Sequence, residues 1–317
     1  EPTPGNFRLA EVPLAQPGAG ELLLETLYLS LDPYMRGRMS DGPSYAQPVP
    51  IDGVMEGGTV SEVAASNNPA FAKGDIVLSR AGWQTHAISN GQGLAKVDPK
   101  IAPISTAVGV LGMPGMTAYT GLLDIGKPQP GETVVVAAAS GAVGSAVGQI
   151  ARIKGARAVG IAGGKDKCDY VKNELGFDEC VDRRDPDLRA KLKAACPKGI
   201  DVYFENVGGA HLDAALPRMN VHGRIPVCGM IASYNGGGEG VTGLFNMIYK
   251  RVRMEGFVAS DFPHLNAQFT SDMTGWLKSG QIKYQETILH GFERAPEGLI
   301  GLFEGRNSGK MLIHIAD

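Results

Sequence analysis

The sequence predicts an α/β protein made of a β-rich region and a doubly wound parallel sheet. Residues 1 to about 112 contain short apolar segments separated by Pro and Gly, which indicates antiparallel strands. From residue 133 onward, strand-like and helix-like segments alternate at βαβ spacing, which indicates a parallel sheet covered by helices. The chain has 317 residues, enough for two domains of ordinary size.

The β-rich region is expected to form strands at 21–29, 53–63 and 75–78. Gly57 and Gly58 lie inside the second of these segments, where adjacent glycines suggest a bulge or a close backbone approach. A small antiparallel barrel or sandwich fits this pattern.

The parallel sheet is expected to begin with an apolar strand at 133–139, followed by an almost wholly buried helix at 142–154. After the alternation ends, residues 286–315 read as strand, helix (295–304) and strand, and we expect them to return to the first domain. The remaining segments are strands at 157–162, 179–181, 201–207, 224–228 and 253–258, and helices at 166–175, 188–195, 211–219 and 263–279.

Composition and charge exclude several classes of function. The chain is 43% hydrophobic and 20% charged, as in a globular protein, and its formal charge of −3 gives no reason to expect nucleic acid as a partner. No apolar run approaches the roughly 20 residues of a membrane helix, so no membrane partner is expected. The four cysteines form no C-x-x-C pair and no histidine has a second ligand at metal-site spacing, which predicts a reducing, cytoplasmic location and no metal. The first residues, Glu1 to Pro4, are neither a signal peptide nor a start methionine, so we expect the natural chain to begin earlier.

The turn after the first predicted parallel strand has the spacing A-x-x-G-x-x-G, from Ala138 to Gly144. Glycine lets a pyrophosphate approach the helix N-terminus, where free N–H groups and the helix dipole favour negative charge. A packed turn without a ligand is the alternative. The position of this turn, after a strand in a βαβ run, favours a bound dinucleotide.

The next predicted strand distinguishes between the two nicotinamide cofactors. An NAD-binding protein carries an acidic residue at this strand's tip for the ribose 2′-hydroxyl. Here the tip reads Ala162-Gly163-Gly164 and two lysines follow, so NADPH is favoured. Lys167 is the better candidate for the 2′-phosphate and Lys165 the second, although either can be a solvated lysine.

Motifs of several other enzyme classes are missing from the sequence. None of the nine tyrosines has Lys four residues later, and there is no G-x-S-x-G or P-loop. An enzyme that uses a nicotinamide without zinc or a Tyr–Lys pair needs another way to stabilise a developing oxyanion. This favours hydride addition to an already activated acceptor.

Six motifs in order resemble the zinc-independent medium-chain dehydrogenase/reductases, in the branch of NADPH-dependent alkenal/one double-bond reductases. They are "LYLSLDPYMRGRM", "MPGMTAY", "AASGAVGS", "FENVGG", "GRIPVCGMIASYN" and "GRNSGK". The resemblance covers nearly the whole chain. It implies a GroES-like catalytic domain at 1–112 and 286–317, and a Rossmann NADP-binding domain at 113–285. Asp32 and Val54-Met55 stand where zinc-dependent relatives place a Cys and a His ligand, which agrees with the expectation of no metal.

The resemblance also implies which residues contact NADPH. One departure is Arg183, which follows the third strand where the family often has a stacking Tyr; it can pair with the 2′-phosphate or point to solvent. The other implied cofactor contacts are Gly141, Ala142, Val143, Gly144, Lys167, Asn206, Cys228, Gly229, Met230, Ile231, Ala232, Ser233, Tyr234, Phe257, Val258, Ala259 and Asn307.

The activity implied by the resemblance is hydride addition to the β-carbon of an α,β-unsaturated ketone or aldehyde. Tyr234 is expected to donate a hydrogen bond to the carbonyl oxygen, because a phenol is protonated at neutral pH. Tyr34 and, more weakly, Tyr45 are candidates for the acceptor pocket. A quinone reductase and a non-catalytic NADPH-binding protein remain as alternatives. The family also implies a homodimer.

Overall fold

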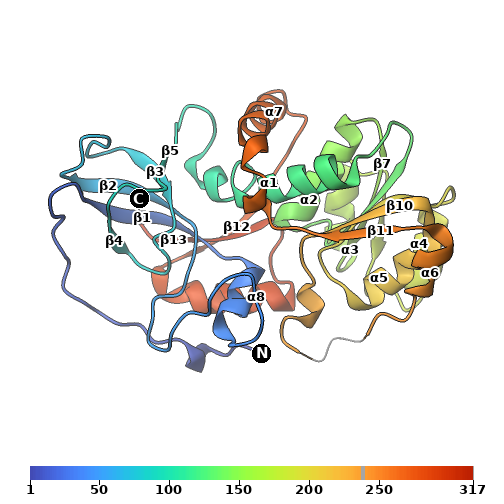
Figure 1. The fold of residues 1–317 in the computed structure, drawn as a ribbon, viewed down its shortest axis with the longest axis horizontal. Coiled ribbons are helices and arrows are strands. Elements are labelled where there is room, and N and C mark those ends of the chain that lie inside the picture. The colour runs from blue at the N-terminus through green and yellow to red at the C-terminus, as the bar shows by residue number, and fades with distance from the viewer. Residues whose placement is uncertain (237–239, 317) are drawn as a thin grey trace. The chain divides into compact units, whose positions relative to one another are not determined.

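The structure is a computed structural model that describes residues 1–236 and 240–316. The chain divides into two compact units, one formed by Glu1–Gly112 with Glu286–Asp317 and the other by Met113–Gln285 (Figure 1). No helix in the described part of the chain has the length and apolar character that crossing a membrane requires.

The first unit is built on one seven-stranded sheet in the order β12-β13-β1-β2-β3-β5, with β4 paired to β1. The helix α8 (Ala295–Glu304) connects β12 to β13 and packs on β13. The strands are β1 (Leu22–Ser30), β2 (Thr59–Ser66), β3 (Ile76–Ser79), β4 (His86–Ser89), β5 (Ala95–Lys96), β12 (Glu286–His290) and β13 (Lys310–His314).

Two details of this sheet differ from the sequence-based expectations. Strands β12 and β13 run parallel, because α8 carries the chain back to the starting edge, so the sheet is mixed rather than antiparallel. The strand expected at 53–63 begins only at Thr59. A Cβ on Gly57 would lie 2.8 Å from Leu29 Cδ1, so this glycine makes room for a side chain rather than for another backbone segment.

A buried ion pair holds the middle of this sheet to the segment after β1. Lys310 Nζ lies 3.1 Å from Asp32 Oδ1, and both side chains are at most 8% exposed. The ammonium also donates to the carbonyl oxygens of Leu31 and Met311. Burial lowers the pKa of Lys310, although Asp32 opposes that change. Such a pair is costly to break singly, because the remaining charge would stay buried without its partner.

The second unit is built on a six-stranded sheet in the order β11-β10-β9-β6-β7-β8, and every neighbouring pair is parallel. The chain starts at β6 in the middle, winds outward through β7 and β8, and then crosses to β9 on the other side. This is the Rossmann strand order, with its switch point between β6 and β9. The strands are β6 (Thr133–Ala137), β7 (Arg157–Ala162), β8 (Glu179–Asp182), β9 (Ile200–Phe204), β10 (Met219–Val227) and β11 (Arg253–Gly256).

The helices of this unit bury both faces of the sheet, as a parallel sheet requires. In β6, Val134, Val135, Val136 and Ala137 are all fully buried. The helix expected at 166–175 is an α-helix only to Asp169 and continues as a π-helical turn. The helices are α1 (Met113–Thr120), α2 (Ala142–Ile153), α3 (Lys165–Asp169), α4 (Leu188–Ala195), α5 (Gly209–Ala215), α6 (Phe245–Lys250) and α7 (Asn266–Lys278).

Candidate dinucleotide site

The glycine turn between β6 and α2 lies at the carboxyl end of the central strand. Gly141 N donates to Ala138 O across 2.9 Å, and α2 begins at the next residue. Ala138 has a φ of 51°, a left-handed conformation that is rare for alanine and costs about 1–3 kcal/mol. Strain of this kind is found most often at active sites and ligand-binding turns.

The absence of a side chain at Gly144 gives this turn its shape. A Cβ there would lie 2.3 Å from Ala138 O and 2.9 Å from Ala138 C, both backbone atoms. The first turn of α2 can therefore lie directly against the end of β6, with its unpaired N–H groups beyond the carboxyl ends of the strands. This arrangement fits a pyrophosphate at the helix N-terminus.

Three cations gather beyond the tip of β7, beside the glycine turn. A Cβ on Gly163 would lie 2.9 Å from Arg183 Nε, and one on Gly164 would lie 2.9 Å from Arg184 Nη1, so both guanidinium groups lie close over this tip. Burial, and then the positive charges of Arg183 and Arg184, lower the pKa of Lys167. Like charges held this close are stabilised by a bound dianion, so the cluster fits a 2′-phosphate.

The backbone of this cluster is held by Asp182 at the end of β8. Its carboxylate accepts from Gly164 N at 2.8 Å and from Arg184 N at 2.9 Å, and these bonds contribute to the lowered pKa of Asp182. Lys165, the second candidate for the 2′-phosphate, forms an ion pair with Asp169 one helical turn later. The structure therefore places Arg183 with Lys167 and gives Lys165 a different partner.

Asn206 connects three strand ends at the switch point of the sheet. It follows β9, and its Nδ2 donates to Ala137 O at the end of β6 across 2.7 Å. Its Oδ1 accepts from Cys228 Sγ, just beyond β10, across 2.7 Å. The side chain predicted to lie near the cofactor thus fixes the crevice in which dinucleotides bind in this fold.

A buried carboxyl group, Glu205, shapes the turn that follows β9. It is fully buried and accepts from Val207 N at 2.6 Å and Gly208 N at 2.9 Å. Burial raises the pKa of Glu205 despite these bonds, and burial together with Glu205 raises the pKa of Cys228. Glu205 was not predicted from the sequence, although a single acidic residue at the end of an apolar strand was the available signal.

The segment from Cys228 to Tyr234 runs along the turn after β9. Ile231 N donates to Asn206 O and Ala232 N to Val207 O, so backbone bonds hold the segment at the carboxyl edge of the sheet. Tyr234 OH accepts from Met230 N at 3.3 Å, which folds its ring back over its own loop. The remaining members of this segment, Gly229 and Ser233, lie in the same loop.

The segment Phe257 to Ala259 continues from β11 beside the end of β10. Phe257 N donates to Val227 O, and its ring packs edge to face on Phe204 and Phe262. The ring therefore contributes to packing. Val258 and Ala259 are half-buried.

The candidates Tyr34 and Tyr45 belong to the first unit, where Arg38 brings them together. The Arg38 guanidinium lies 5.4 Å from the centre of the Tyr34 ring and 4.7 Å from that of Tyr45. Arg38 is only 3% exposed and pairs with Glu56 at 2.9 Å, whereas Tyr45 is 66% exposed. Arg38 was not predicted from the sequence. Asn307 also lies in this unit and donates to Gly309 O.

The described residues contain no group of three or more His, Cys, Asp or Glu side chains placed to hold a metal ion. A Rossmann sheet with a strained glycine turn, a cationic cluster beyond its second strand and an asparagine at its switch point defines the chain as a dinucleotide-binding protein.

Comparisons with known proteins assign the family. Residues 1–97 match the family described as N-terminal domain of oxidoreductase, and residues 142–276 match that described as zinc-binding dehydrogenase. The chain is 52% identical to the NADPH-dependent curcumin reductase of Escherichia coli (strain K12) over 99% of its length and 93% of that protein. It is 46% identical to the 2-alkenal reductase (NADP(+)-dependent) of Nicotiana tabacum, over 94% and 88% of the two chains. The solved structure of CurA from Vibrio vulnificus in complex with NADPH superposes with a TM-score of 0.95 at 49% identity, over 100% and 96% of the two chains.

The chain belongs to the zinc-independent medium-chain dehydrogenase/reductases, in the branch of NADPH-dependent alkenal/one double-bond reductases. This membership confirms the predicted fold class, with a GroES-like β-rich domain and a Rossmann domain. It also confirms NADPH as the cofactor and the class of enzyme, an NADP-dependent oxidoreductase acting on CH–CH groups. The roles of individual residues remain predictions.

Proposed function

We propose that this protein reduces the C=C bond of α,β-unsaturated ketones and aldehydes with NADPH. The observation that carries the proposal is the position of the Cys228–Tyr234 segment, which backbone bonds fix beside Asn206 at the switch point of the sheet. Ligands of Rossmann folds bind at this switch point. The relatives named as curcumin and 2-alkenal reductases support an enone or enal as the acceptor.

The cofactor's 2′-phosphate is proposed to bind between Lys167 and Arg183. Both side chains lie at the tip of β7, and the tip itself, Ala162-Gly163-Gly164, contains no acidic residue. The nearby carboxylate of Asp182 already accepts from Gly164 N and Arg184 N. Replacing Lys167 by Gln should weaken NADPH binding about tenfold and leave NADH binding almost unchanged. An equal loss for both cofactors would contradict this assignment.

Tyr234 is proposed to stabilise the negative charge that collects on the acceptor's carbonyl oxygen. NADPH, when bound, supplies the hydride that adds to the β-carbon, and solvent supplies the proton that completes the saturated bond at the α-carbon. The neutral phenol donates a hydrogen bond to the oxygen as its charge grows, and an oxyanion donor of this kind contributes about 10²–10³ in kcat. The Met230 N–H holds the phenol oxygen at the loop.

The test is NADPH oxidation with a panel of enones, enals and quinones, in wild type and Tyr234→Phe. We expect turnover with enones and enals, and a loss of about 10² in kcat for the variant with unchanged NADPH affinity. Tyr249→Phe is the matched control, because Tyr249 is 51% exposed on α6 and its hydroxyl bonds Asn246. If Tyr234→Phe has the same kcat as the control, the role proposed for Tyr234 is wrong, but the proposed reduction of the C=C bond is not affected.

The same panel separates the two alternatives. Faster turnover of quinones than of enones would indicate a quinone reductase. Tight NADPH binding without turnover of any acceptor would indicate a non-catalytic NADPH-binding protein.

A cytoplasmic homodimer is part of the proposal. On α6, Phe245 and Ile248 are each 71% exposed, and Val221 of β10 is 53% exposed. The neighbouring strand β11 pairs only with β10 among the described residues, so it offers an edge for a second chain. Light scattering should give twice the chain mass. A monomer at micromolar concentration would refute this part.

A further inference from the structure

A basic cavity lies at the amino ends of β10 and β11, opposite the carboxyl edge that carries the glycine turn. Its volume is about 320 Å³. Two arginines in it, Arg224 and Arg253, sit opposite each other in the β10–β11 register. The cavity is lined by Ile125, Lys127, His222, Arg224, Arg251 and Arg253, so five of its six lining residues are basic.

Residues with a left-handed backbone conformation are concentrated at this cavity. Of the five non-glycine residues with positive φ in the described part of the chain, three line it: Lys127 at 46°, His222 at 62° and Arg251 at 50°. A fourth is Ala138 of the glycine turn. Lys127 and Arg251 are the left-handed caps that end the helical segment Gly121–Gly126 and α6, so the helix ends account for both. His222 is the one of the three that no helix end explains. His222 also lies where the register between β9 and β10 shifts.

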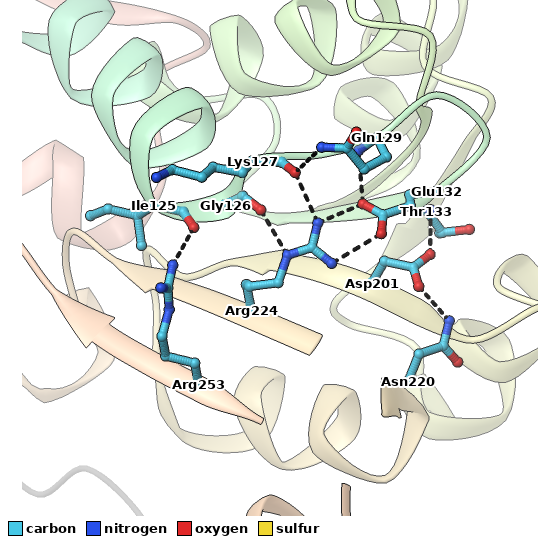
Figure 2. A network of polar contacts seen from close by, with 10 residues as sticks. All are labelled: Ile125, Gly126, Lys127, Gln129, Glu132, Thr133, Asp201, Asn220, Arg224 and Arg253. Atoms are coloured by element: carbon cyan, nitrogen blue, oxygen red, sulfur yellow. Dashed lines mark hydrogen bonds and ion pairs between the residues drawn. The ribbon is translucent and has the colours of Figure 1, made fainter. Parts of the chain in front are cut away.

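Arg224 and Arg253 have structural partners around the cavity (Figure 2). Arg224 donates to Gly126 O and Lys127 O and pairs with Glu132, and Arg253 donates to Ile125 O. These bonds satisfy the carbonyl groups that end the helical segment before β6. The two arginines are therefore explained by the fold.

The other basic residues of the cavity have no comparable structural role. The ammonium of Lys127 and the ring of His222 have no hydrogen-bond or ion-pair partner in the described part of the chain, and Arg251 donates only to Tyr249 O. The cavity thus has four permanent positive charges, and only two carboxylates, Glu132 and Glu255, form ion pairs with them. The chain as a whole carries a net charge of −3, so this excess is local.

We propose that this cavity is an anion site, separate from the dinucleotide site, that binds a small phosphate-bearing anion. Lys127 and Arg251 would supply the charges that contact the anion, and His222 would add a ring N–H. Arg224 and Arg253, held by their backbone bonds, would keep the walls in place. The hollow in the surface and the local excess of positive charge around it support a site of this kind.

Calorimetric titration of inorganic pyrophosphate into the NADPH-saturated protein tests the proposal, because NADPH then occupies the glycine turn. We expect one binding event that weakens as sodium chloride is raised. Lys127→Gln combined with Arg251→Gln should weaken it about 100-fold, or about tenfold per charge removed. The matched control, Lys193→Gln with Lys198→Gln, removes two exposed charges from α4 and the loop after it and should leave the affinity unchanged.

The NADPH affinity and melting temperature of both double variants report whether the fold is intact. Retained NADPH binding with lost pyrophosphate binding supports the proposal. Absence of pyrophosphate binding to the saturated wild type, or equal binding in both double variants, overturns it. Neither result depends on which acceptor the enzyme reduces.

Discussion

Replacing Gly144 by alanine tests the geometry of the glycine turn most directly. The new Cβ would lie 2.3 Å from Ala138 O, whereas real contacts of this kind do not fall below 3.0 Å. The obstructing atoms belong to the backbone, so a rotamer change cannot relieve the overlap. The turn would have to move away from α2 by about 0.7 Å.

The expected effect on folding is small and that on binding is large. Overpacking costs about 1–3 kcal/mol, while alanine in a helix recovers about 1 kcal/mol relative to glycine. The net loss of stability is therefore about 0–2 kcal/mol. Losing one N–H bond to a charged phosphate costs about 1.5–3 kcal/mol, which weakens NADPH binding about ten- to hundredfold.

Fluorescence titration with NADPH and urea unfolding measure the two effects. Gly275→Ala is the control, because Gly275 lies within α7 and a Cβ there meets nothing within 4 Å. We expect the control to gain about 0.5–1 kcal/mol and to bind NADPH like wild type. Wild-type affinity in Gly144→Ala would refute the argument that this turn must approach the helix so closely.

Three further predictions concern the same unit. Asn206→Ala removes two hydrogen bonds at the switch point and should lower the free energy of unfolding by about 1–3 kcal/mol; a smaller loss in urea unfolding would show that the strand ends hold without it. Burial lowers the pKa of His211 to about 4. Between about pH 6.5 and 4 the unfolded chain therefore binds a proton at His211 and the folded chain does not, so the free energy of unfolding falls as the pH drops through this range. The loss of stability should reach about 3 kcal/mol at most and should be smaller in His211→Gln. If the free energy of unfolding depends on pH in the same way in the two proteins, this prediction is wrong. Gly121→Ala places a Cβ 2.4 Å from Phe257 Cζ and should cost about 1–3 kcal/mol, because that ring is itself packed on Phe204; an unchanged melting temperature would show that the rings can move.

Sequence periodicity predicted most of the second unit because each parallel strand is short, apolar and followed by a helix. The expected strand at 157–162 and helix at 188–195 have the observed bounds. The parallel pairing of β12 and β13 was not predicted, although the strand–helix–strand pattern expected at 286–315 is the arrangement that makes neighbouring strands parallel. The π-helical turn after Asp169 was missed because its side-chain pattern is that of an ordinary helix.

Local motifs predicted the parts of the candidate site that lie within one turn, such as Gly141 to Gly144. Contacts between distant segments were not predicted. Arg38 faces two tyrosines only because the segment between them folds as it does. The basic cavity draws its lining from three segments about a hundred and about thirty residues apart, and no spacing rule joins them.

The position of β13 in the first sheet has a consequence for biosynthesis. This strand lies between β12 and β1, so β12 cannot join the sheet until residues 310–314 have left the ribosome. The second unit, by contrast, is encoded without interruption between Met113 and Gln285. We therefore expect the order of folding to invert the order of translation: the unit that is made second becomes protease-resistant first, and the unit that contains the N-terminus waits for the last strand.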